Sequence, residues 1–193
     1  ILPLWCIVTE SRRFIAILSD TGEQANEFLE FIKAELENNE RLREDFPTAC
    51  GQGRTWKTGH IITANRIKIR CWGTGQSQRG ARHGSSRPDL VICDDLENDD
   101  QASSPEQRRK IENWFVKAVM KMGSRKTVFV VVGTILHYDS LLSKLLKRPG
   151  WLGRKFKAII KYSISPLWEK WERLYSFVCN SDIMPVDSAT SSD

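Results

Sequence analysis

Three short apolar runs, at residues 14–18, 90–93 and 128–132, constrain the fold of this chain most. Each is a run of consecutive apolar residues as long as a strand that is buried on both faces. Two amphipathic segments, 25–36 and 105–122, separate them and carry apolar side chains at helical spacing. Strands that alternate with helices predict an α/β domain, with a mostly parallel sheet flanked by helices.

Local signals place the remaining elements. Ser104 is a good N-cap, Pro105 fits the first helical position, and Gly123 is expected to end that helix. The other expectations are a loop at 51–59, paired strands at 61–63 and 67–71 around 64–66, a glycine- and arginine-rich surface loop at 72–88, and a helix at about 140–146.

Composition narrows the class of protein. Hydrophobic residues make up 40% of the 193 residues, which is enough for a core, and the formal net charge of +5 is compatible with a polyanionic partner. The sequence has no apolar run long enough to cross a membrane. Its five cysteines are scattered without zinc-site spacing, which favours free thiols in a reducing cytoplasm.

The strongest local signal is the apolar run 90–93 followed by Asp94 and Asp95. A carboxylate at the tip of a buried strand can hold hydrated Mg²⁺, and the next acid can orient a water molecule. This is the Walker B arrangement, although a buried strand can also end in Asp at an ordinary turn. Glu97, Asp99 and Asp100 add three more carboxylates, so residues 94–100 form either a metal site or a solvated acidic loop.

A Walker A loop, G-x-x-x-x-G-K-[ST], would be expected to accompany a Walker B strand, and the sequence contains none. The nearest approach is 51–58, where Trp56 stands at the position of the second glycine. An indole there would block the close approach of backbone N–H groups to phosphate. No helix is expected after Thr58, so residues 51–58 are not expected to bind phosphate.

Other candidate residues are weaker when each is considered alone. Gly133 and Thr134 end the most strand-like segment and could place a hydroxyl near a phosphate, or could form a simple turn. Arg79, Arg82 and Arg87 in the loop could contact phosphate or act on a neighbouring subunit, or could be solvated.

A basic stretch follows the last expected strand. No Asp or Glu occurs from Ser140 to Trp168, and the basic residues there are Lys144, Lys147, Arg148, Arg154, Lys155, Lys157 and Lys161. Such a run is either a solvated face or a surface that contacts phosphates.

Taken in order, these segments resemble phage terminase large subunits. The resemblance rests on 14–21 with Gln24–Ala25, 35–39, Arg79-Gly80-x-Arg82, 87–97 and 132–137, and it covers roughly residues 1–170. It implies a P-loop ATPase fold of the ASCE (RecA-like) type, which couples ATP hydrolysis to viral DNA packaging into a capsid.

The resemblance also implies roles for individual residues. Asp94 matches the metal-binding acid, and Asp95, or alternatively Glu97, matches the acid that activates water. Gly133 and Thr134 match the motif that couples hydrolysis to motion and contacts the nucleotide. Arg79 or Arg82 matches the region of a trans-acting arginine. The implied cofactors are Mg²⁺ and ATP, and the implied partners are double-stranded DNA, other terminase subunits, the small terminase and the portal, in the cytoplasm of a bacterial host.

The sequence departs from the family in two respects. The family's Walker A segment would precede Ile1, and no nuclease domain follows, so residues 1–170 are expected to be a partial ATPase domain with little or no activity alone. Loss of a central strand would expose a sheet edge and favour association. Residues 171–193 are expected to form a divergent, disordered tail. Two alternatives stay open: a non-catalytic module that binds DNA or a partner through 144–161, and a metal-dependent nuclease that uses the acids of 94–100.

Overall fold

The computed structural model describes residues 1–77, 81–161 and 164–181. It divides into two units, the first ending at Gly153 and the second beginning at Arg154. The first unit holds the sheet and its covering helices, and the second holds α8 (Pro166–Ser181). Each unit is described by itself.

The first unit is built on a six-stranded mixed sheet in the order β2-β3-β4-β1-β5-β6. Strands β4, β1, β5 and β6 run parallel, whereas β3 lies antiparallel between β2 and β4. The strands are β1 (Phe14–Ser19), β2 (Thr55–Lys57), β3 (His60–Ile62), β4 (Lys68–Gly73), β5 (Leu90–Asp94) and β6 (Val128–Val132). The α/β class is therefore confirmed, and the sheet is mixed, with four parallel strands out of six.

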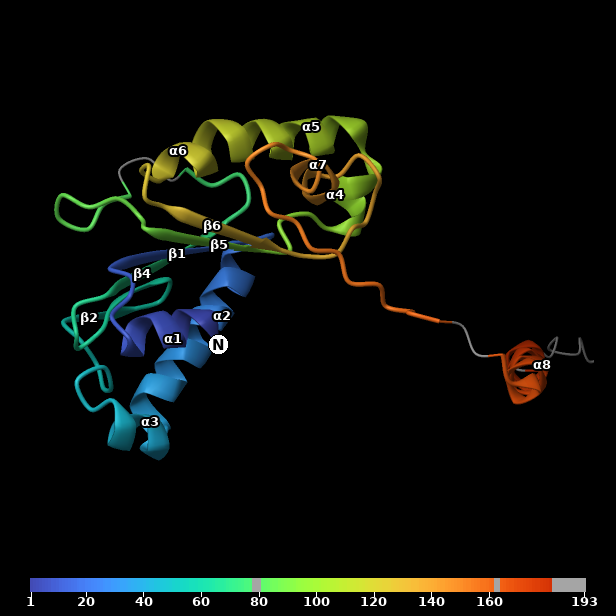
Figure 1. Ribbon diagram of the computed structural model, residues 1–193, viewed down its shortest axis with the longest axis horizontal. Coiled ribbons are helices and arrows are strands. Elements are labelled where there is room, and N and C mark those ends of the chain that lie inside the picture. Colours follow the sequence, from blue (N-terminus) through green and yellow to red (C-terminus); the bar gives the residue numbers. More distant parts are fainter. Residues whose placement is uncertain (78–80, 162–163, 182–193) are drawn as a thin grey trace, which may run out of the picture. The chain divides into compact units, whose positions relative to one another are not determined.

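Helices cover both faces of this sheet (Figure 1). On one side lie α1 (Leu2–Val8), α2 (Gly22–Asn38) and α3 (Glu40–Asp45). On the other lie α4 (Asp99–Ser103), α5 (Pro105–Trp114), the π-helical turn η1 (Phe115–Val119), α6 (Met120–Met122) and α7 (Leu141–Leu145). Strand β1 is buried throughout because its side chains alternate between two cores: Ile15 and Ile17 pack toward α2, and Phe14 and Leu18 toward η1 and α7.

Side-chain caps explain where the main helices begin. Thr21 accepts a hydrogen bond from the Gln24 N–H at 3.1 Å and starts α2. Ser104 accepts one from the Gln107 N–H at 3.4 Å and starts α5, as predicted. The expected helices and the hairpin of β3 and β4 are confirmed, whereas α1, α3 and the three-residue strand β2 have no counterpart among the predicted elements.

Strand β6 differs from the expectation in its position. Its very apolar sequence is typical of a central strand, yet β6 is the edge strand and, in the part of the chain that the structure describes, pairs only with β5. Val128 is 41% exposed and Val132 is 56% exposed. The sheet therefore presents an apolar free edge.

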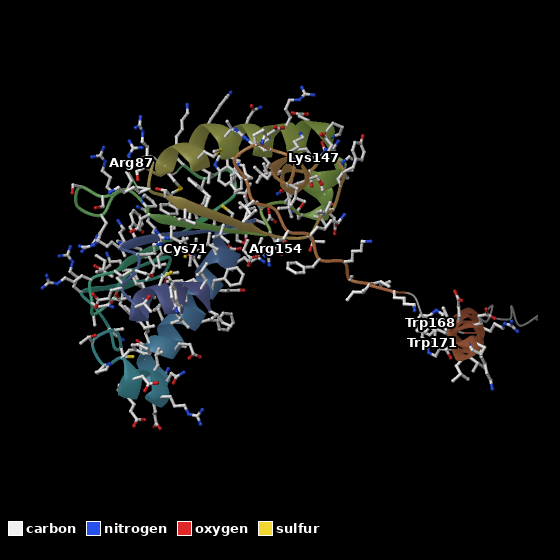
Figure 2. All side chains as sticks on the ribbon, in the orientation of Figure 1. Cys71, Arg87, Lys147, Arg154, Trp168 and Trp171 are labelled. Carbon is white, nitrogen blue, oxygen red and sulfur yellow. The ribbon has the colours of Figure 1, made fainter. Side chains whose placement is uncertain are left out.

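In the second unit, residues 154–161 form neither helix nor strand, and α8 begins at Pro166. The rings of Trp168 and Trp171 stack at 5.2 Å, and those of Trp171 and Tyr175 at 5.0 Å, on an exposed helix (Figure 2). Residues 171–181 of the expected disordered tail thus lie in a helix, and 182–193 lie outside the described residues. Within the described ranges, no helix is both long and apolar enough to span a bilayer.

Candidate metal site at the carboxyl edge of the sheet

The parallel strands β1, β5 and β6 deliver polar residues to one edge of the sheet. Their carboxyl ends carry Ser19, Asp94 with Asp95, and Gly133 with Thr134. Ligands of open α/β sheets bind outside the carboxyl ends of the strands. The topology therefore brings together two of the segments that the sequence analysis singled out.

Asp94 is the half-buried acid of this edge. Its main-chain oxygen accepts a hydrogen bond from Ser19 Oγ at 3.0 Å, which ties the ends of β1 and β5 together. Its carboxylate has no hydrogen-bond or ion-pair partner among the described residues. Burial, and then the charge of Asp95, raise the pKa of Asp94. A cation bound here would offset both effects.

Asp95 links the ends of β5 and β6. Its N–H donates to the Val132 carbonyl at 3.1 Å, and its Oδ1 accepts the Thr134 N–H at 3.1 Å. Its backbone is left-handed, with φ of +42°, which is uncommon for a residue other than glycine. A Cβ on Gly133 would lie 2.9 Å from Asp95 Oδ1, so glycine at 133 permits this close approach. Asp95, Gly133 and Thr134 thus form one hydrogen-bonded corner.

Glu97 lies in the same loop but reaches a different element. Its Oε2 accepts the Leu141 N–H at 2.8 Å, at the start of α7, while its Oε1 is buried without a partner in the described structure. Burial raises the pKa of Glu97, an effect that the N–H groups of Leu141 and Leu142 and then the charges of Lys144 and Arg108 oppose. Glu97 therefore anchors the amino end of α7.

The remaining acids of 94–100 also separate. Asp99 and Asp100 lie exposed in the first turn of α4, which Asn98 caps. Asn98 Nδ2 also donates to Asp20 at 2.9 Å, so the start of α4 is joined to the end of β1. No group of three or more His, Cys, Asp or Glu side chains suited to a metal converges within the described ranges. The acidic loop is thus not a single cluster.

The two predicted arginines that the structure describes, Arg82 and Arg87, do not reach this edge. Arg79 lies outside the described residues. Arg87 donates from Nη1 to the carbonyls of Lys121 at 2.9 Å and Gly123 at 3.2 Å, and so caps the end of α6 (Figure 2). The carbonyl of exposed Arg82 accepts a hydrogen bond from Lys68, the first residue of β4. Both residues lie near the amino ends of strands, whereas Asp94 lies at the carboxyl end of β5. A five-residue strand such as β5 is roughly 16 Å long, which is the approximate distance between these two edges of the sheet.

Two features of the edge escaped the sequence analysis. Ser19 and Asp20 both hold the loops of this edge, and their place directly after the run 14–18 was the available signal. In the segment 51–58, Thr55–Lys57 form β2 and Trp56 packs against the core.

Comparison of the sequence with models of known protein families gave no match, and comparison with curated proteins gave none either.

Proposed function

We propose that this chain forms part of a P-loop ATPase of the terminase type, which drives DNA packaging. The observation that carries the proposal is the corner where Asp94 and Asp95 at the end of β5 meet Gly133 and Thr134 at the end of β6. An unpaired, half-buried carboxylate at the carboxyl edge of the sheet suits a metal–phosphate ligand.

The donor set fits Mg²⁺. This ion takes one or two carboxylates and completes its shell with water and phosphate oxygens, so Asp94 alone can anchor it. When bound, Mg²⁺ neutralises charge on nucleotide phosphates. Asp95, held by the Thr134 N–H, would orient a water molecule, and the Thr134 hydroxyl would face the phosphate. Glu97 is engaged with α7, which favours Asp95 over Glu97 for the water.

The phosphate cradle would come from outside these residues. Nothing in the described sequence forms a glycine-rich loop that opens a helix, and the Thr134 N–H is already bonded to Asp95. The position nearest the site where another strand could pair with the sheet is the exposed edge of β6, which is apolar. We propose that a strand carrying the phosphate loop pairs there, which would cover an edge that otherwise favours aggregation. Arg82 lies near the amino ends of the strands, away from Asp94, so it could contact phosphate only in the site of a neighbouring subunit.

Nucleotide titration tests the proposal. The chain as given is expected to bind a fluorescent ATP analogue with Mg²⁺ weakly, because positioning of the phosphates supplies most of such a site's function. The chain extended at its N-terminus by a strand, a G-x-x-x-x-G-K-[ST] loop and a helix is expected to gain binding. Asp94→Ala should abolish that gain and Asp99→Ala should preserve it. No gain, or a gain independent of Asp94, would contradict the proposal.

One alternative retains an observation in its favour. Six basic side chains of the predicted stretch are exposed without an ion-pair partner in the described structure: Lys147, Arg148, Arg154, Lys155, Lys157 and Lys161. Lys144 instead pairs with Glu112 at 2.7 Å and Asp139 at 3.2 Å. These residues could serve a non-catalytic DNA-binding module, for which Asp94 would be irrelevant. The nuclease alternative gains no support from acids 94–100, because they diverge to different elements.

A further inference from the structure

A second basic region, free of acids, lies earlier in the chain. Residues 46–88 contain eight Lys and Arg residues and no Asp or Glu. Part of this stretch folds as the antiparallel strands β2 and β3 and the adjoining β4, at the side of the sheet away from β6. Its basic residues are Arg54, Lys57, Arg66, Lys68, Arg70, Arg79, Arg82 and Arg87.

Strand register aligns part of this charge into a row. Lys57 is directly opposite His60, and His60 is directly opposite Arg70. Residues directly opposite one another across strands share a face of the sheet. The alternate residues, among them Ile61 and Ile69, pack in the core against α2. The row therefore lies on the face away from α2.

The row has no carboxylate to balance it. None of the ion pairs within the described ranges involves a residue from 46–88. Burial lowers the pKa of His60, and the charges of Lys68, Arg70, Lys57 and His83 lower it further. Lys57 and Arg70 lie on either side of His60, and their charges repel each other across it. An anionic ligand that contacts both would reduce this repulsion.

Local contacts hold the cations in place. The Arg70 guanidinium lies over the Trp72 ring at 4.9 Å, and Lys68 Nζ lies over the Phe14 ring at 4.7 Å. Lys57 and Arg70 are exposed. Two inter-strand spacings separate them, about 10 Å. A strand of duplex DNA carries one phosphate per about 3.4 Å of its axis, so the row spans several phosphates.

We propose that this face of β2, β3 and β4 binds the phosphate backbone of duplex DNA without sequence preference, through Lys57 and Arg70, with His60 as a neutral donor between them. The choice of DNA as the polyanion rests on the proposed function. The surface itself, on β2, β3 and β4, is separate from the Asp94 edge.

Salt-dependent binding of a labelled duplex tests this surface. Each phosphate contact contributes about 0.9 to the slope of log K against log salt, so each lost contact reduces the affinity drop between 50 and 200 mM salt by about 3.5-fold. Lys57→Gln and Arg70→Gln are each expected to show that reduction. Arg41→Gln, an equal charge change on exposed α3, is the matched control and should leave the slope unchanged.

Further outcomes separate the proposals. Lys57 is exposed on short β2, and its side chain makes no hydrogen bond, ion pair or ring contact with the described residues. Lys57→Gln should therefore keep the wild-type unfolding temperature even if Arg70→Gln, which loses the Trp72 contact, does not. Asp94→Ala should bind the duplex as wild type does, so a failed nucleotide site would not mask this result. Unchanged slopes in both variants, or equal competition by polyglutamate of matched charge, would overturn the proposal.

Discussion

At the scale of single residues, the ionised carboxylate of Asp94 lowers the stability of the fold, and no partner among the described residues offsets this effect. Its carboxylate is half-buried beside Asp95, and its pKa is raised for those two reasons. When the pKa of a carboxyl group is higher in the folded state than in the unfolded state, the free energy of unfolding is greatest below the pKa of the unfolded state. It decreases as the pH rises through the pKa of the folded state. The ionised side chain therefore destabilises the native state at neutral pH.

Asp94→Asn removes this charge and is expected to raise the midpoint of thermal unfolding at pH 7. The gain should shrink as the pH falls through the raised pKa of the folded state and vanish below 3.8, the ordinary value for this group, because the wild-type carboxyl is then protonated in both states. Differential scanning calorimetry at several pH values measures it. A lower midpoint for Asp94→Asn at neutral pH would show that the carboxylate has a stabilising partner.

Glu97 is expected to behave differently, because its carboxylate accepts the Leu141 N–H at the start of α7. Glu97→Ala should cost about 1–2 kcal/mol of unfolding free energy, as loss of a helix-capping acceptor does, whereas Glu97→Gln keeps an acceptor and should cost less. Urea denaturation gives both values. Equal stability of Glu97→Ala and wild type would refute the anchoring role.

At the scale of elements, the strands and helices that could be predicted are those with strong local signals. The runs at 14–18 and 90–93 are buried strands, and Ser104 and Pro105 start a helix, because burial and capping act locally. The short strand β2 escaped prediction because three residues carry no periodicity of their own. The edge position of β6 escaped because apolar composition does not report how many neighbours a strand has.

The candidate site could likewise be predicted only where its residues follow strands with a strong local signal. Asp94 and Asp95 follow a recognisable strand, and Gly133 and Thr134 follow another, so their meeting at one edge follows from parallel pairing. The separate roles of Glu97 and Arg87 depend on α7 and α6, elements distant from them in sequence. Contacts of that kind are set by tertiary packing and leave no local pattern.

The free edge of β6 is expected to mediate self-association in solution. Val128→Lys places a charge on this edge, far from Asp94, and should weaken dimerisation by about tenfold, or about 1.4 kcal/mol. Phe31→Lys replaces another exposed apolar residue, on α2, and should have no such effect. Sedimentation velocity over a concentration series distinguishes them. An equal effect of both changes would indicate general hydrophobic association.

At the scale of the whole molecule, the described chain consists of a sheet-containing unit and a second unit that begins at Arg154. Both buried cores are formed by residues up to Leu145, and Trp151 packs at their margin against Phe115 and Phe129. Removal of the second unit therefore takes nothing from either core.

A chain shortened to residues 1–153 is expected to unfold cooperatively, within a few degrees of the full chain, because a change below 1 kcal/mol shifts the midpoint of a domain this size by only that much. Circular dichroism during heating measures it. Loss of the cooperative transition would show that residues beyond Gly153 support the core.

We propose that Asp94, beside the corner of Asp95, Gly133 and Thr134, holds a metal ion, and titration with Mn²⁺ followed by electron paramagnetic resonance tests that claim. Wild type and Asp99→Ala are expected to bind one ion with the same affinity, and Asp94→Ala is expected to lose that ion, because only Asp94 offers an unpaired, half-buried carboxylate at the carboxyl edge described here. Identical binding by all three proteins would contradict the claim.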